Sequence, residues 1–122
     1  MSDQAIAVLV VEDEFLLRLD IADALEAAGF IVFQAENAHQ AIQLLIANDR
    51  IRVLFTDVDM PGDLDGLRLA ALVRDRWPPI RIILTSGHQW LHEDRLPPGG
   101  RFLPKPYHPD RVISSIRELV QA

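Results

Sequence analysis

The chain has 122 residues, a length that fits one domain with a single core over residues 1–122. Its net charge of −6 and its scattered arginines argue against direct nucleic-acid binding, because a DNA-binding domain gathers Lys and Arg on one face. The absence of cysteine excludes disulfides and thiol catalysis, and no apolar run approaches the ~20 residues of a membrane span, so we expect no membrane contact and a cytoplasmic location.

Short apolar runs alternate along the chain with longer amphipathic runs, and this order predicts a parallel sheet covered by helices. Residues 6–11 are continuously apolar and mostly β-branched, which predicts a strand buried on both faces. In the segment 14–29, apolar residues recur at helical spacing from Phe15 to Leu25, and Gly29 ends the predicted helix. The chain therefore opens as a strand followed by a helix.

The rest of the chain repeats this alternation. Asp65 and Gly66 can start a third helix, which two consecutive prolines end, and Pro109 stands in the first turn of a last helix, where proline is favoured. Residues 87–100 leave room for about two helical turns, so we expect a short or irregular fourth helix there. The other predicted elements are strands over 30–35, 53–57, 80–86 and 101–104 and helices over 38–48 and 67–77.

Polar side chains gather where the predicted strands end. In an open parallel sheet, ligands bind at the carboxyl ends of the strands, so these side chains predict a site. Like charges about 4 Å apart repel by roughly 4 kcal/mol at an effective dielectric of about 20, so crowded carboxylates either hold protons or bind a cation. Hard oxygen ligands favour Mg²⁺. The residues at these strand ends are Glu12, Asp13, Asp57, Asp59, Thr85, Ser86 and Lys105.

A carboxylate, a Mg²⁺ ion, a hydroxyl and an ammonium together predict a phosphoryl-transfer site, in which Asp57 can attack phosphorus while metal and lysine neutralise the oxygens. Lys105 is the only lysine among twelve basic residues, and its compact point charge suits that task. Each group alone also fits a structural role, such as helix capping for Glu12 and Asp13 or a turn for Asp57. The coincidence of four strand ends favours the phosphoryl-transfer site.

Four motifs of the chain, "VLVVEDE", "FTDVDMPGDLDGL", "IILTSGH" and "FLPKPY", resemble the successive signatures of response-regulator receiver domains. The resemblance covers essentially the whole chain. It implies a flavodoxin-like α/β fold, a doubly wound five-stranded parallel sheet with strand order 2-1-3-4-5. It also implies a cis peptide before Pro106, which aims Lys105 into the acidic pocket.

The same resemblance implies a role for each site residue. Asp57 is expected to be the phospho-acceptor, and the metal, Mg²⁺ or Mn²⁺, is expected to have ligands from Asp13, Asp57 and the backbone carbonyl of Asp59, with Glu12 acting through water. Ser86 is the expected switch hydroxyl, Phe102 the switch aromatic, and Lys105 the cation on a phosphoryl oxygen. Asp59 and His88 flank the expected path of the hydrolytic water, so we expect them to tune the dephosphorylation rate.

The implied function is a phosphorylation-dependent switch rather than an enzyme. A histidine kinase or a phosphotransfer protein is the expected phosphoryl donor to Asp57, and a downstream protein of unknown identity is the expected output partner. The chain carries no output domain after its last helix, so we expect a stand-alone receiver or a receiver of a larger hybrid kinase. Two departures from the family pattern are one extra residue in "MPGDLDG" and the short segment between Gly87 and Gly100.

Two alternatives stay open at this point. "VLFTDVDMPG" also resembles the nucleophile motif of haloacid-dehalogenase-type phosphatases, with Asp57 as nucleophile and Asp59 as acid and base, although that family places its other acidic metal ligands after the nucleophile. The other alternative is a receiver-like binding module that acts without phosphorylation, although such modules generally lack part of the acidic set.

Overall fold

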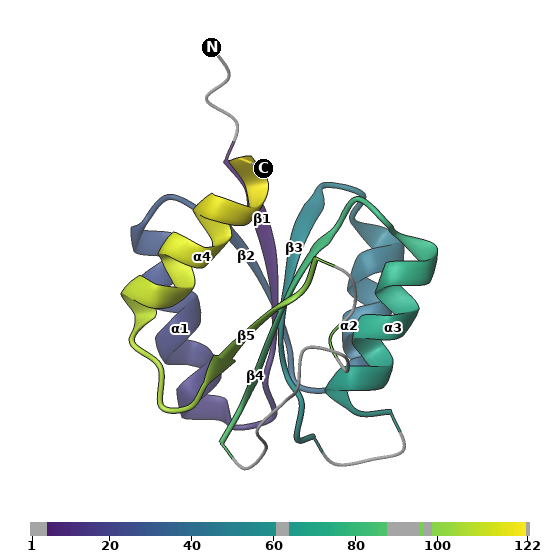
Figure 1. Cartoon of the computed structure of the whole chain (residues 1–122), viewed down its shortest axis with the longest axis horizontal. Helices are drawn as coiled ribbons and strands as arrows, with labels where there is room; N and C mark the ends of the chain where they lie inside the picture. Colours follow the sequence, from purple (N-terminus) through teal and green to yellow (C-terminus); the bar gives the residue numbers. More distant parts are fainter. Residues whose placement is uncertain (1–4, 61–63, 88–95, 97–98, 122) are drawn as a thin grey trace.

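Figure 1 shows the computed structural model of the chain, which describes residues 5–60, 64–87, 96 and 99–121. Five strands and four helices are assigned among these residues. They are β1 (Ala7–Val11), α1 (Phe15–Ala27), β2 (Ile31–Ala35), α2 (Ala38–Ala47), β3 (Ile51–Asp57), α3 (Gly66–Arg76), β4 (Arg81–Ser86), β5 (Arg101–Pro104) and α4 (Pro109–Gln121).

The strands form one parallel sheet in the order β2-β1-β3-β4-β5, as expected. Helices α1 and α4 cover one face of the sheet, and α2 and α3 cover the other (Figure 1). The interior strand β1 is buried along its whole length, as its continuous apolar run predicts. Alternate residues of β1 face the two sides, so that Leu9 joins the core beneath α2 and α3 while Val10 joins the core beneath α1 and α4. The fold is therefore the predicted doubly wound α/β sheet.

Local sequence signals set the helix starts. The side chain of Asp65 accepts a hydrogen bond from the backbone N–H of Arg68 at 2.9 Å, and in the same way Asn37 accepts one from Gln40 at 2.8 Å at the start of α2. Such side-chain acceptors satisfy backbone donors that have no partner inside the helix. The prediction that α3 begins at Asp65 and Gly66 is confirmed.

Strand β3 begins two residues earlier than the predicted strand over 53–57. Ile51 is buried and pairs with Ala7 of β1, and the register between the two strands shifts immediately after this pair. The polar Arg52 interrupts the apolar run. Hydrophobicity along the sequence therefore did not indicate that the strand includes Ile51 and Arg52. Arg52 is exposed while its neighbours on both sides are buried.

Helix α1 buries only part of its apolar surface. Ile21, Ala22 and Leu25 face the sheet, whereas the side chains of Phe15 and Leu16 are 60% and 73% exposed. Helical spacing alone predicts an apolar stripe without saying which end of the helix the core reaches. The apolar residues at the start of α1 therefore face solvent.

Two expectations fall on residues outside the described ranges. The short or irregular fourth helix was predicted within residues 87–100, of which only Gly87, Leu96, Gly99 and Gly100 are described, and no helix is assigned among these four. The extra residue of "MPGDLDG" belongs to a loop whose residues 61–63 are likewise outside. Within the described ranges, none of the helices has the length and apolar character that crossing a membrane requires.

Candidate functional site

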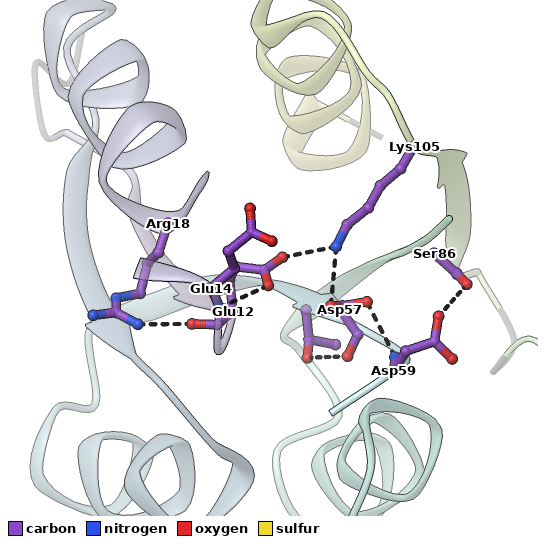
Figure 2. Close-up of polar contacts among 8 residues, drawn as sticks. Glu12, Glu14, Arg18, Asp57, Asp59, Ser86 and Lys105 are labelled. Atoms are coloured by element: carbon purple, nitrogen blue, oxygen red, sulfur yellow. Dashed lines mark hydrogen bonds and ion pairs between the residues drawn. The ribbon is translucent and has the colours of Figure 1, made fainter. Parts of the chain in front are cut away.

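The carboxyl ends of four strands converge on one cleft with a volume of about 600 Å³. Acidic side chains from the ends of β1 and β3 lie opposite a lysine that follows β5 (Figure 2). This is the edge at which ligands bind in open parallel sheets. The cleft is lined by Glu12, Asp13, Glu14, Leu17, Asp57, Asp59, Gly87, Lys105, Pro106 and Tyr107.

Asp57 is the last residue of β3 and is only 3% exposed. Its two carboxylate oxygens have different partners: Oδ2 lies 3.0 Å from the Lys105 ammonium, and Oδ1 accepts a hydrogen bond from the backbone N–H of Asp59 at 3.1 Å. These two contacts hold the carboxylate in one orientation at the base of the cleft (Figure 2). Asp57 is thus a buried acid with a cation beside it.

The backbone around Asp57 requires glycine at the start of α3. A Cβ atom on Gly66 would lie 2.0 Å from the carbonyl oxygen of Asp57 and 2.7 Å from the Cα atom of Val58. The N–H of Gly66 donates to the carbonyl of Val58 at 3.1 Å, which ties α3 directly to the end of β3. The missing side chain of Gly66 therefore lets the helix approach the strand end that carries Asp57.

Lys105 bridges the two buried acids. Its ammonium lies 3.0 Å from Oε1 of Glu12 and 3.0 Å from Oδ2 of Asp57, and its backbone N–H donates to the carbonyl of Ser86 at 2.9 Å. The peptide between Lys105 and Pro106 is cis, as the sequence resemblance implied. Lys105 thus joins the ends of β1 and β3 through its ammonium and the end of β4 through its backbone.

Glu12 follows β1 and is 3% exposed. Oε2 of its carboxylate accepts a hydrogen bond from the backbone N–H of Glu14 at 3.1 Å, and its carbonyl oxygen accepts one from Nη1 of Arg18 at 2.8 Å. Nε of Arg18 also donates to the side chain of Gln34 on β2 at 3.3 Å. Arg18 therefore fastens the turn between β1 and α1 to the sheet.

Burial and charge shift the acidity of these groups. Burial raises the pKa of Glu12 to about 7, although the N–H of Glu14 and the ammonium of Lys105 act in the opposite direction. Burial raises the pKa of Asp57 as well, again against the effect of Lys105. For Lys105, burial lowers the pKa, but its hydrogen bonds to Asp57 and Glu12 outweigh burial and leave the pKa raised. One lysine is not enough to compensate two buried carboxylates.

The remaining negative charge of the cleft is suited to a bound cation. Carboxylate oxygens of Glu12, Asp13 and Asp57 lie within 4.8 Å of one another, and Asp13 is the exposed member of the three. Three carboxylates without sulfur or imidazole are the donors of a hard cation. The residues present therefore fit the predicted metal site.

Of the two predicted switch residues, the structure places Ser86 at the carboxyl edge of the sheet and Phe102 within β5. Ser86, the last residue of β4, is buried, and its hydroxyl donates to Oδ2 of Asp59 at 2.5 Å. Thr85, beside it, is also buried and has no assigned role. Phe102 on β5 is half-buried and packs against the core beneath α2 and α3, away from the cleft. His88, the second predicted rate-tuning residue, lies outside the described residues.

Three contributors to the cleft were not predicted from the sequence. Arg18 is one of eleven arginines, and nothing in its neighbourhood marks it as a support of the acidic turn. Gly66 was assigned only a helix start. Tyr107 lines the cleft, and its ring meets Phe55 edge to face with the centroids 5.4 Å apart. Burial, followed by the charges of Glu12 and Asp57, raises the pKa of its hydroxyl.

Comparison with known proteins identifies this arrangement. Residues 8–117 match the family model of the response regulator receiver domain. A response regulator receiver protein from Sinorhizobium medicae WSM419 superposes with a TM-score of 0.90 at 30% identity, covering 99% of this chain and 98% of that one. The receiver domain of the hybrid histidine kinase CckA superposes with a TM-score of 0.75, also at 30% identity, over 93% of this chain and 97% of that one.

Curated relatives are longer proteins. The sensor kinase CckA of Brucella abortus (strain 2308) is 30% identical over an aligned length of 118 positions, and the match covers 93% of this chain and 12% of the kinase. The hydrogenase transcriptional regulatory protein HoxA of Cupriavidus necator is 33% identical over an aligned length of 127 positions, gaps included, and the match covers 100% of this chain and 26% of that regulator. The match thus spans about an eighth of the length of the kinase and about a quarter of the length of the regulator. It belongs to the response regulator receiver domain family and is a non-enzymatic module of phospho-acceptor signalling, not a phosphatase.

Proposed function

We propose that Asp57 is the phospho-acceptor and that the phosphoryl donor is the phosphohistidine of a histidine kinase or of a phosphotransfer protein. The supporting observation is the setting of Asp57, a carboxylate 3% exposed at the base of the cleft, held between the ammonium of Lys105 and the N–H of Asp59. A carboxylate held in this way is oriented to attack phosphorus, because little further conformational entropy is lost when the donor binds.

The chemistry is a transfer between nucleophiles. An oxygen of Asp57 attacks phosphorus, the P–N bond of the donor breaks, and an acyl phosphate forms while the imidazole leaves. Lys105, already 3.0 Å from Asp57, stays beside the phosphoryl oxygens as their cation. We propose that Mg²⁺ or Mn²⁺ is held by Asp13, Asp57 and the carbonyl of Asp59, with Glu12 acting through water; when bound, the ion neutralises phosphoryl charge.

Phosphorylation then acts as a switch. The added charge favours a second arrangement in which Ser86 donates its hydroxyl to the phosphoryl group and Phe102 repacks. The half-buried position of Phe102 on the edge strand β5 supports this role, because a ring there can change its packing without disturbing the fully buried core. The repacked surface would be recognised by a downstream protein.

The exposed start of α1 is the surface on which we expect the phosphohistidine protein to bind. Glu14 and Leu17 line the cleft and also a second hollow along α1, whose other lining residues are Leu16, Leu19, Asp20 and Asp23. An apolar strip with an acidic border, continuous with the cleft, suits an amphipathic helix that carries basic residues. Leu16→Asp should therefore slow labelling by purified phosphorylated histidine kinases and leave labelling by acetyl phosphate unchanged.

We also propose that residues 1–122 form one receiver domain that acts in the cytoplasm. Both routes suggested by the relatives remain compatible with this: a stand-alone receiver, as in the protein from Sinorhizobium medicae, and a receiver within a longer hybrid kinase, as in CckA.

Incubation with acetyl phosphate and Mg²⁺, followed by intact mass measurement, tests the proposal. We expect the wild-type protein to gain one acid-labile phosphoryl group and Asp57→Asn to gain none. Labelling of Asp57→Asn at the wild-type level would overturn the site assignment. A wild-type protein that gains no mass would instead be a binding module that acts without phosphorylation.

A further inference from the structure

Asp59 makes two contacts at the cleft, one from its backbone and one from its side chain. Its N–H donates to Oδ1 of Asp57 at 3.1 Å, and Oδ2 of its carboxylate accepts the hydroxyl of Ser86 at 2.5 Å. The carboxylate is therefore a link between the loop after β3 and the last residue of β4 (Figure 2). Ser86 is buried, whereas Asp59 is exposed at the mouth of the cleft.

The bond from Ser86 to Asp59 excludes another bond. A serine hydroxyl has a single proton and donates it to one acceptor at a time. A hydroxyl that donates to a carboxylate makes a short, charge-assisted bond, about twice as strong as a bond between neutral groups. While Ser86 donates to Asp59, it cannot donate to a phosphoryl group on Asp57.

Loss of the hydrogen bond between Ser86 and Asp59 has a second consequence. When Ser86 turns away, the carboxylate of Asp59 loses its hydrogen-bond donor and remains beside a newly added phosphoryl group of the same charge. Both effects have the same sign, because each makes the arrangement with Ser86 on the phosphoryl group less favourable. Asp59 should therefore oppose the switch rather than assist it.

We propose that Asp59 is a positioning residue that acts through Ser86, holding the switch hydroxyl in its unphosphorylated position and thereby lowering the population of the switched state. The inference rests on the proposed function, in which Ser86 binds the phosphoryl group. The proposed role belongs to the carboxylate of Asp59 and is separate from that of its backbone carbonyl, which any substitution at this position retains. Phosphorylation would have to break the hydrogen bond between Ser86 and this carboxylate.

A thermodynamic cycle tests the inference with beryllium fluoride, a phosphoryl analogue, in the presence of Mg²⁺. NMR titration gives its apparent Kd for the wild type, Asp59→Ala, Ser86→Ala and the double variant. We expect Asp59→Ala to bind about tenfold more tightly than the wild type, the size of one charge-assisted hydrogen bond. In the Ser86→Ala background the same substitution should change the apparent Kd by no more than about threefold, the part due to charge alone.

Glu14→Ala is the matched control, since it removes one carboxylate from the same cleft while the hydrogen bond from Glu14 to the Glu12 carboxylate is donated by its backbone N–H. Glu14→Ala should change the apparent Kd for beryllium fluoride by the same small factor in the wild-type and Ser86→Ala backgrounds. An effect of Asp59→Ala that is equal in both backgrounds would overturn the inference and leave the proposed function standing. A wild-type protein that does not bind beryllium fluoride would overturn both.

A second measurement needs neither metal nor analogue. Three-bond couplings report the χ1 rotamer of Ser86 in the free protein. We expect one dominant rotamer in the wild type and in Glu14→Ala, and a shift in the rotamer populations in Asp59→Ala, because the hydroxyl loses the acceptor Oδ2 of Asp59. Rotamer populations of Ser86 that are unchanged in Asp59→Ala would show that the carboxylate does not hold the side chain.

Discussion

Gly66 offers a direct test of how the site is built, because adding one methyl group there should damage both stability and phosphorylation. The new Cβ would lie 2.0 Å from the carbonyl oxygen of Asp57. Carbon–oxygen contacts in proteins lie at about 3.3 Å or more, so α3 and the end of β3 would have to separate by more than about 1 Å. The three nearest atoms, in Asp57 and Val58, all belong to the backbone, so no side-chain rotation relieves the contact.

The expected cost follows from what such a separation breaks. Overpacking in a rigid region costs about 1–3 kcal/mol, and loss of the bond from the Gly66 N–H to the Val58 carbonyl, 3.1 Å long here, adds about 1 kcal/mol. We therefore expect Gly66→Ala to lower the free energy of unfolding by about 3 kcal/mol and Tm by about 10 °C. Helix propensity alone predicts the opposite sign, since Ala is favoured over Gly by about 1 kcal/mol in helix interiors.

Urea unfolding and labelling with acetyl phosphate measure the two effects. Gly87→Ala is the matched control, because among the described residues its added Cβ would meet only the side chain of Lys105, at 3.6 Å, which is an ordinary contact. The control should stay within about 1 kcal/mol of the wild type. Equal denaturation midpoints for Gly66→Ala and Gly87→Ala would refute the claim that the missing side chain of Gly66 is needed for the approach of α3 to Asp57.

Three further predictions concern the buried charges. Asp57→Asn should raise the stability of the metal-free protein, because it removes one of two buried carboxylates, and added Mg²⁺ should shrink this gain; equal midpoints without metal would contradict the clustering of charge. Lys105→Arg should still bind Mg²⁺ but take up and retain the phosphoryl group poorly, since a planar guanidinium fits the space of a compact ammonium badly; wild-type labelling and lifetime would contradict this. The metal-free protein should lose stability as pH rises from about 4.5 to about 7, because the pKa of Glu12 is higher in the folded state than in the unfolded state. The loss in the free energy of unfolding is at most about 3 kcal/mol, and screening by water in the open cleft makes it smaller. Urea midpoints across this pH range, compared with those of Glu12→Gln, measure the last effect, and identical slopes would count against it.

The sequence predicted the sheet because burial on both faces leaves a plain signal. A strand such as β1, with every residue buried, must be apolar throughout, and its apolar run of residues 6–11 showed this. The polar residues that follow such runs then stand at one edge of a parallel sheet. Glu12, Asp57 and Lys105 were brought together by this argument, and the structure joins them through one ammonium.

Other features depend on distances that no pattern along the chain encodes. The approach of Gly66 to the Asp57 carbonyl joins residues nine positions apart through the path of a loop. The contact between Asp59 and Ser86 depends on side-chain orientation at the ends of two strands. Arg18 was indistinguishable from a solvent-exposed helix residue until its hydrogen bond to the Glu12 carbonyl was seen. The pattern of apolar runs thus predicted where the site lies, whereas the contacts within the site could be identified only from the three-dimensional structure.

These contacts explain why a cleft with excess negative charge can accept an anionic group at all. Two buried carboxylates share one ammonium, and burial raises the pKa of both acids in spite of it. We therefore expect a cation to bind favourably, and only with that added charge should a phosphoryl group become acceptable beside Asp57. The ammonium of Lys105 is already in contact with the proposed phospho-acceptor, so it need not cross the cleft. The hydroxyl of Ser86, by contrast, donates to Asp59 and would have to exchange its acceptor in the proposed switch. In the proposed function, the cation that favours transfer is thus already in place, whereas the hydroxyl that couples transfer to a change in shape has to move.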